Sequence, residues 1–138
     1  MINNNFEKKL KSKEFVFTAE TSPPDSTVRS EITDRVLCLK DLADAINVTD
    51  GASAKSHLSS LVVSSIIKDI EIEPILQLTT RDRNRIAIQS DLLGAWTLNI
   101  QNILCIYGDQ VETGDQPETK EVRDLDTLGV INLSLIHI

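Results

Sequence analysis

Four short runs of strand-forming residues recur at intervals of about 28 to 30 residues, the length of one strand–helix unit. The first run, residues 14–19, is rich in β-forming side chains, and the others cover residues 45–48, 74–78 and 102–107. The later runs are almost continuously apolar, which suits strands buried on both faces in a parallel sheet covered by helices. The sequence therefore predicts four parallel strands.

Helical periodicity fills the stretches between these runs. Apolar residues recur at steps of three and four, so each stretch predicts a helix with one apolar face. The residues expected on these faces are Ile32, Val36, Leu39, Ala43 and Ile46 in the first helix, Leu58, Leu61, Val62 and Ile66 in the second, and Ile86, Leu92, Leu93 and Trp96 in the third. Asp82 is expected to cap the third helix or to place a negative charge at its first turn.

Strand–helix alternation with short links fits either an open doubly wound sheet or a (β/α)8 barrel. No Gly-rich dinucleotide fingerprint follows the first expected strand, which disfavours the simplest open-sheet alternative. The chain has 138 residues, about half of the roughly 250 that a whole barrel needs. We therefore predict an α/β fold that is the N-terminal half of a TIM barrel, with about four parallel βα units.

Three segments are expected along the chain. Residues 1–13 form a polar N-terminal extension, residues 14–131 form the partial barrel, and residues 132–138 read as an apolar tail without helical amphipathicity. A closed barrel would need four further βα units, so we expect the chain to be part of a longer protein.

Charge and cysteine usage exclude several classes of protein. A net charge of −7 argues against a nucleic-acid binder, and no apolar run is long enough to cross a bilayer. The N-terminus lacks a secretory hydrophobic stretch, so a cytoplasmic location is expected. Cys38 and Cys105 read as small buried side chains in a reducing compartment. His57 and His137 have no ligand partners at useful spacing, so no metal site is expected.

Polar and acidic residues gather where each expected strand ends. In a parallel barrel all these ends meet at one rim, where barrel enzymes place their chemistry. The pattern therefore predicts a functional site at this rim. The four strand ends read Glu20-Thr-Ser-Pro-Pro24, Thr49-Asp-Gly-Ala52, Gln77-Leu-Thr-Thr-Arg-Asp82 and Gly108-Asp109.

Glu20 and Asp109 are the strongest candidates for chemistry at this rim. Partial desolvation of Glu20, which precedes a stiff Pro23-Pro24 loop, would favour its protonated form and suit a general acid. The alternative for Glu20 is a solvated side chain at a strand end. Asp109 follows Gly108, which lets the backbone pass close to a ligand, although Gly-Asp is also an ordinary turn.

Charged residues close to two helix starts are expected to lie on the surface. Arg81, Arg83 and Arg85, with Asp82, predict a salt-bridged cluster that contributes little energy. Lys55, near the start of the second helix, is likewise expected to be solvated.

Taken together, the strand-end motifs resemble the methylenetetrahydrofolate reductase family. The order and spacing match over roughly residues 14 to 129, and seven weak motifs in the right order make a strong resemblance. The motifs are Glu20-Thr-Ser-Pro-Pro, Val48-Thr-Asp-Gly-Ala52, Gln77-Leu-Thr-Thr-Arg-Asp-Arg-Asn-Arg85, Gln89-Ser-Asp-Leu-Leu-Gly94, Gly108-Asp109, Gly114-Asp-Gln-Pro117 and Asp124-Leu-Asp126.

The resemblance implies a barrel that binds FAD at its C-terminal rim and works by two hydride transfers. NAD(P)H reduces the flavin, and the flavin then reduces 5,10-methylenetetrahydrofolate to 5-methyltetrahydrofolate in one-carbon and methionine metabolism. The protein supplies orientation and charge, while the cofactor carries the electrons. The expected partners are the folate and NAD(P)H, with no nucleic acid or membrane, and the full-length protein is expected to be a homo-oligomer.

The resemblance also implies roles for individual residues. Glu20 matches the general acid that protonates a folate ring nitrogen so that an iminium forms. Asp109 matches the aspartate near the flavin and the folate, where its negative charge tunes the flavin and steadies the cationic iminium. The positions that match those lining FAD are Thr49, Asp50, Ala52, Gln77, Tyr107, Gly108 and Asp109.

Four of the matched positions depart from better-known members of the family. Thr21 and Ser22 stand where those members have aromatic residues, Gln77 stands in place of a histidine, and Tyr107 stands where some members have a basic residue.

Two alternatives to the reductase remain open. The chain could be a non-catalytic barrel fragment or assembly module that binds a partner through an open sheet edge. It could also belong to another pterin-binding barrel, such as a pteroate synthase. If only these residues are present, we expect weak or absent flavin binding and no turnover.

Overall fold

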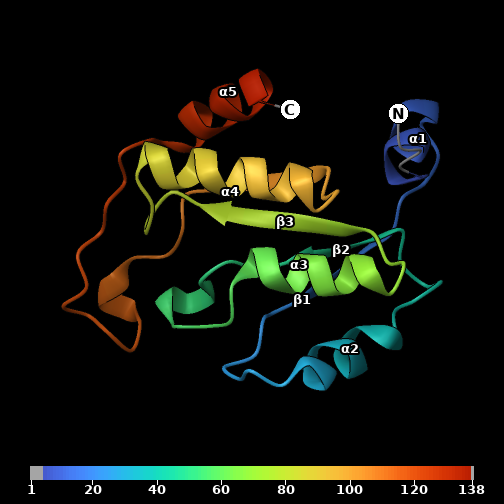
Figure 1. Cartoon of the computed structure of the whole chain (residues 1–138), viewed down its shortest axis with the longest axis horizontal. Coiled ribbons are helices and arrows are strands. Elements are labelled where there is room, and N and C mark those ends of the chain that lie inside the picture. Colours follow the sequence, from blue (N-terminus) through green and yellow to red (C-terminus); the bar gives the residue numbers. More distant parts are fainter. Residues whose placement is uncertain (1–4, 138) are drawn as a thin grey trace.

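The computed structural model describes residues 5–137. It contains four strands that alternate with helices, as the sequence predicts (Figure 1). The elements are α1 (Asn5–Ser12), β1 (Thr18–Thr21), α2 (Arg29–Leu37), β2 (Ala45–Val48), η1 (Ala52–Ala54), α3 (Ser60–Asp69), β3 (Pro74–Thr79), α4 (Arg85–Thr97), β4 (Asn102–Ile106), η2 (Val111–Thr113) and α5 (Thr127–His137).

The four strands form one parallel sheet in the order β1-β2-β3-β4. Glu20 of β1 pairs with Asn47 of β2, and Asn47 pairs in turn with Ile75 of β3. Each strand thus lies beside its neighbour in sequence, the arrangement of successive units in a βα barrel. Within residues 5–137, β1 pairs only with β2 and β4 only with β3, so the sheet is open at both edges. The predicted half barrel is confirmed.

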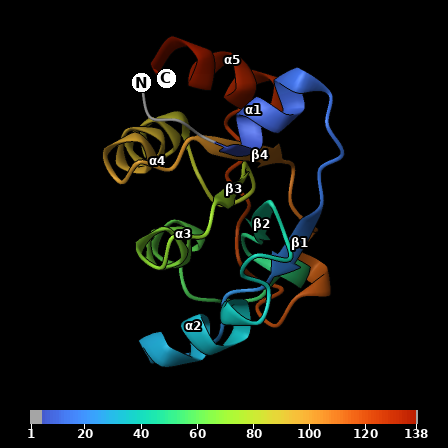
Figure 2. The same cartoon turned by 90° about the vertical axis from the view of Figure 1, so that its right-hand side faces the viewer.

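Helices α2, α3 and α4 cover one face of the sheet (Figure 2). Alternate residues of each strand point toward them, because successive side chains in a strand face opposite sides. The largest cluster on this face joins α2, β2 and α3 and consists of Ile32, Val36, Ile46, Val48, Val63, Ile66, Ile67 and Ile72. A second cluster joins β3 to α4 and α5 and consists of Leu78, Ile88, Leu92 and Val130, and a third joins β3 to α4 and consists of Leu76, Ala95 and Ile100.

The first strand begins later than the sequence predicts. Residues 14–17 precede β1, and the side chains of Phe15 and Phe17 are exposed. The expectation of a strand over residues 14–19 is therefore only partly met. Pairing with β2 begins at Thr18, so the residues before it have no neighbouring strand to extend the ladder.

The first expected helix is shorter than its apolar pattern. α2 ends at Leu37, and Asp41 adopts a left-handed conformation (φ 66°) that interrupts any further helix. Ile46, the last residue of the pattern, belongs to β2. The three- and four-residue spacing beyond Leu37 therefore continues through a turn and does not mark a helix face.

The buried face of α4 also differs from the predicted one. Ile88, Leu92 and Ala95 are buried, whereas Ile86, Leu93 and Trp96 are largely exposed. The small Ala95 side chain lies on the sheet side, and the bulkier residues lie on the outer surface.

The N-cap of α4 is Asn84 and not Asp82. The Asn84 side chain accepts a hydrogen bond from the Ala87 N–H at 3.0 Å. The carboxylate of Asp82 is instead bound by Arg81. The capping prediction for Asp82 is therefore wrong.

The two ends of the chain contain helices. Residues 5–12 of the expected N-terminal extension form α1, and residues 132–137 of the expected apolar tail continue α5. Val130 is buried in the cluster with Leu78, Ile88 and Leu92, and Leu133 packs against that cluster. The apolar residues of α5 therefore cover the surface of α4. Residues 1–4 and Ile138, which belong to those two expected segments, lie outside the described residues.

The cysteines are less buried than expected. Cys38 is exposed at the end of α2, and Cys105 on β4 is half-buried against the cluster that contains Leu78 and Ile88. Burial raises the pKa of the Cys105 thiol above its ordinary value. None of the helices within residues 5–137 combines the length and apolar character needed to span a membrane.

Candidate functional site

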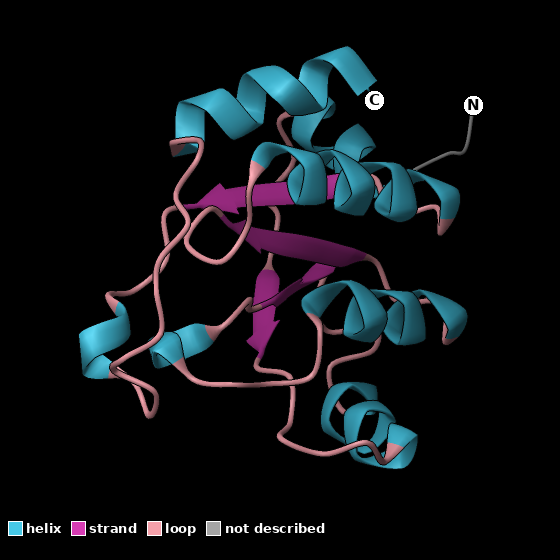
Figure 3. Ribbon diagram, turned by 60° about the vertical axis from the view of Figure 1, so that its left-hand side comes forward, coloured by secondary structure: helices cyan, strands magenta, loops and turns pink. Residues whose placement is uncertain are grey.

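A cleft of ≈ 370 Å³ opens at the end of the sheet where the strands terminate. The short helices η1 and η2 lie side by side beyond the arrowheads of the strands, in the loops that follow β2 and β4 (Figure 3). We call this the rim cleft, and it contains seven of the eight predicted site residues, with Tyr107 outside it. Its lining residues are Glu20, Thr49, Asp50, Ala52, Gln77, Ile106, Gly108 and Asp109.

Glu20 and Gln77 meet on the face of the sheet that α2, α3 and α4 do not cover. The Gln77 amide donates to Glu20 Oε2 at 3.4 Å, although Glu20 is level with Ile75 in the ladder. The contact thus advances two residues over two strands, which is the stagger of an eight-stranded barrel with a shear of 8. Glu20 is exposed toward the cleft, so the expected partial desolvation of its carboxyl group is not seen.

Asp109 is held by the loop that follows β2. Its Oδ2 accepts a hydrogen bond from the Ser53 N–H at 2.8 Å. Gly51, Ser53 and Ala54 in this loop all have positive φ angles of 54° to 58°. A left-handed conformation is strained at the two non-glycine positions, so contacts such as that with Asp109 must hold the loop in shape.

Asp50 lies in the cleft wall, but its carboxylate serves the scaffold. The residue is 8% exposed, and Oδ2 accepts from the Thr79 N–H at 2.9 Å while Oδ1 accepts from the Ser60 hydroxyl at 3.0 Å. Arg83 donates to both oxygens, at 2.6 and 3.3 Å, and also binds Asp91. These partners lie in β3, in α3 and just before α4, so the Asp50 carboxylate ties the loop after β2 to the rest of the fold.

Arg83 is a bridge between β2 and α4, not the exposed surface residue predicted from the sequence. Although burial alone lowers the pKa of its guanidinium, hydrogen bonds and charges from Asp50 and Asp91 raise that pKa above its ordinary value. A partly buried cation with two carboxylate partners stays charged and links the two elements.

Arg81 is buried at the rim of the sheet, whereas the sequence predicts a salt-bridged position on the surface. It is 3% exposed, and its guanidinium donates to the Gly51 carbonyl at 3.3 Å, the Asp109 carbonyl at 3.2 Å and both carboxylate oxygens of Asp82 at 2.7 Å. The hydrogen bonds to Asp82 raise the pKa of Arg81 above its ordinary value. Its position directly after a strand buried on both faces was the available signal, since a side chain there can turn inward.

The β4 loop is held from its other side by Arg123. This guanidinium lies 3.7 Å from the centre of the Tyr107 ring and donates to the Tyr107 carbonyl at 2.7 Å. It also pairs with Glu121, whose Oε1 accepts from the Val111 N–H at 3.4 Å. The Arg123 hydrogen bond lowers the pKa of Glu121, and the same bond raises the pKa of Arg123. Neither residue is predicted from the sequence, because both lie in the irregular segment between η2 and α5.

Close packing against Thr79 requires a glycine at position 108. A Cβ atom there would lie 2.2 Å from Thr79 Oγ1, and the φ angle is 87°. We expected glycine at this position to let the backbone approach a ligand, but the close neighbour in the structure is Thr79. The effect is to bring the start of the Asp109 loop tightly against the end of β3.

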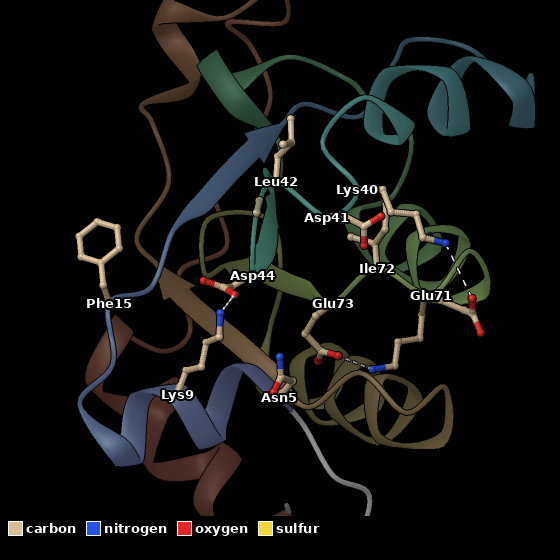
Figure 4. Close-up of a pocket in the computed structure, with 12 residues that line it drawn as sticks. Asn5, Lys9, Phe15, Lys40, Asp41, Leu42, Asp44, Glu71, Ile72 and Glu73 are labelled. Carbon is tan, nitrogen blue, oxygen red and sulfur yellow. Dashed lines mark hydrogen bonds and ion pairs between the residues drawn. The ribbon is translucent and has the colours of Figure 1, made fainter.

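A larger cleft of ≈ 730 Å³ lies at the opposite end of the sheet, where the strands begin (Figure 4). Three lysine–carboxylate pairs surround this base cleft: Lys9–Asp44, Lys40–Glu71 and Lys68–Glu73. These charges neutralise one another, and the N-terminal face of a βα barrel is associated with stability and not with chemistry. The rim cleft is therefore the better candidate site despite its smaller volume.

Comparison with known proteins identifies the family of the chain. The family model described as methylenetetrahydrofolate reductase matches residues 5–134, nearly the whole chain. A comparison with curated proteins finds no significant match.

Proposed function

Because this chain belongs to the methylenetetrahydrofolate reductase family, we propose that it forms part of an enzyme that reduces 5,10-methylenetetrahydrofolate to 5-methyltetrahydrofolate. In this proposal FAD carries the hydride and NAD(P)H donates it. Family membership supports the reductase-like activity, and the cofactor, the donor, a place in one-carbon metabolism and a cytoplasmic location are the proposed details.

One observation carries the proposal. Glu20 from β1, Gln77 from β3 and Asp109 after β4 line a single cleft at the ends of the strands, although they are far apart in the sequence. A general acid and a second carboxylate facing one ligand are what proton transfer to a folate, followed by stabilisation of a cation, require. Two carboxylates at opposite ends of the sheet would not serve this chemistry.

Glu20 is the proposed proton donor to the folate ring nitrogen. Its exposure to the cleft allows proton exchange with solvent between turnovers, and Gln77 orients its carboxyl group through the 3.4 Å contact. Asp109 is the proposed site of negative charge, which attracts a cationic folate. The Ser53 N–H holds one of its oxygens in place, so the charge is preorganised.

The cleft fits the ring system of a flavin better than its phosphates. When bound, the flavin would supply the hydride-carrying chemistry. The Thr49 hydroxyl and the Gln77 amide offer hydrogen-bonding groups for the polar edge of a ring, and Ala52 and Ile106 offer apolar contact. No lysine or arginine is among the lining residues, so in this proposal the pyrophosphate contacts come from outside the rim cleft.

The test separates the two half-reactions in a closed barrel that contains these residues. Glu20→Gln should abolish folate reduction while NAD(P)H-driven flavin reduction survives, because only the folate step needs the proton. Glu31→Gln, at an exposed position on α2, is the matched control and should leave both half-reactions unchanged. Equal loss of both half-reactions in Glu20→Gln would assign Glu20 a structural role and contradict the proposal.

A further inference from the structure

Three loops of the candidate site converge on one buried side chain. Arg81, in the loop after β3, donates to the Gly51 carbonyl in the loop after β2 and to the Asp109 carbonyl in the loop after β4. Its own carbonyl accepts from the Val122 N–H at 2.8 Å, in the segment that carries Arg123. Arg81 thus contacts both loops that carry candidate cofactor-binding residues, the loop after β2 and the loop after β4.

We propose that Arg81 is a positioning residue that fixes the Asp109 carboxylate at the rim cleft. The two backbone carbonyls that it binds belong to the residue that bears this carboxylate and to the loop that supplies the Ser53 N–H. By holding both, the guanidinium sets the distance between the carboxylate and its donor. The use of that charge rests on the proposed function, whereas the contact network does not.

The geometry requires an arginine and not just a positive charge. The Nη1 and Nη2 atoms both lie 3.3 Å from the Gly51 carbonyl, Nη1 also reaches Asp109, and Nε and Nη2 bind Asp82. A lysine ammonium is a point charge without this planar fork, so it cannot reproduce all these bonds at once. A Cβ at Gly51 would lie 2.5 Å from Arg81 Nη2, which shows how closely the loop is drawn to the guanidinium.

Nuclear magnetic resonance on the 138-residue chain can follow this contact without any cofactor. The chemical shift of the Ser53 amide proton changes with pH when the carboxylate that it binds takes up a proton. In the unsubstituted chain we expect the Ser53 amide to report the titration of Asp109. Arg81→Lys should abolish this response while the chain stays folded, and a full response in Arg81→Lys would overturn the proposal.

Two control variants separate positioning from general destabilisation. Arg83→Lys disturbs a neighbouring arginine whose partners are Asp50 and Asp91, and Arg85→Lys changes an exposed residue. Both should keep the Ser53 response, even if Arg83→Lys lowers the stability of the fold. Loss of the response in all three variants would show a non-specific effect and overturn the assignment to Arg81.

A measurement on the unsubstituted chain covers the case in which Arg81→Lys does not fold. The Nη–H resonances of Arg81 should be individually resolved, because its guanidinium is fixed by several acceptors. One averaged, rapidly exchanging signal would overturn the proposal.

Flavin binding and folate reduction are measured in a second experiment, in a closed barrel that contains these residues. Arg81→Lys should there lower the rate of folate reduction by about ten- to a hundredfold, as misplacement of a reacting group does. If that barrel does not bind FAD although Arg81→Lys abolishes the Ser53 response, the proposed function fails and the positioning role stands.

Discussion

The guanidinium of Arg83 donates hydrogen bonds to both carboxylate oxygens of Asp50, with Nη1 2.6 Å from Oδ2 and Nη2 3.3 Å from Oδ1. The two residues are 33 positions apart in the chain, and the pair ties the end of β2 to the start of α4. Asp50 is also bound by Thr79 and Ser60. This bidentate pair therefore fastens together the elements that carry the rim cleft.

Removing one member of this pair should strongly destabilise the fold. Arg83→Met leaves the Asp50 carboxylate buried without its cation, and breaking a buried pair in this way costs about 3 kcal/mol. The free energy of unfolding from urea denaturation measures the effect. The matched control is Arg29→Met, which breaks the exposed Arg29–Asp69 pair (59% and 57% exposed side chains) and should cost less than about 1 kcal/mol. Equal costs for the two variants would contradict the structural role of Asp50.

Alanine at Gly108 should destabilise the protein, whereas alanine at Gly94 should not. At Gly108 the new Cβ would lie 2.2 Å from Thr79 Oγ1 in a left-handed conformation, which costs roughly 1–3 kcal/mol. Gly94 is inside α4, where a Cβ would lie 3.4 Å from Leu61 and alanine is the better helix former. Thermal unfolding of both variants provides the comparison. A Gly108→Ala protein as stable as the unsubstituted chain would refute the close packing against Thr79.

The contribution of Asp44 to stability should depend on pH. Hydrogen bonds from Lys9 and from the Phe17 N–H hold the pKa of this carboxyl group below its ordinary value of 3.8. A lowered folded-state pKa means that the stabilisation is fully present above the ordinary pKa and is lost as the pH falls through the folded one. Asp44→Asn should therefore be less stable than the unsubstituted chain near neutral pH and nearly equal to it in strong acid.

Urea denaturation from neutral pH down to about pH 2.5 measures this difference. Asp69→Asn, which removes an exposed carboxylate, serves as the control and should show little pH dependence relative to the unsubstituted chain. A gap between Asp44→Asn and the unsubstituted chain that grew toward acid pH would have the wrong sign and would exclude the Lys9–Asp44 tie.

The two thiols should react at different rates. Cys38 is exposed, whereas Cys105 is half-buried and its raised pKa leaves less of the reactive thiolate at neutral pH. Alkylation followed by peptide mass spectrometry should show Cys38 modified faster, by on the order of tenfold. A Cys38→Ser variant should retain only the slow phase. Equal rates at the two positions would contradict the packing of β4 against α4.

Much of the fold could be predicted because the central strands are buried on both faces. The limits of β2, Ala45–Val48, agree with the apolar run, and β3 and β4 differ from their runs by a residue at one end. At the β1 edge of the sheet this signal fails, since Phe15 and Phe17 have high strand propensity but no strand beside them. Propensity alone cannot show where a partner strand begins.

The candidate site could be located from the sequence, but not its supports. Glu20 and Gln77 lie near the C-terminal ends of β1 and β3, and Asp109 follows β4. A parallel sheet must bring these strand ends together, so their convergence could be expected. Arg81 and Arg83 could not be assigned in this way, because their partners lie about 30 positions away in other loops. An arginine beside aspartates reads as a surface cluster until the loops around it are placed.

The three lysine–carboxylate pairs of the base cleft stand at the far end of the strands from Glu20 and Asp109. Substitutions in the base cleft are therefore well separated from the rim cleft. The charge pairs of the base cleft could change in evolution to alter stability to heat or salt, while changes in the rim cleft alter ligand choice. The same separation makes α1 a suitable place to attach a probe or a surface tether, since a group attached there does not block the rim cleft.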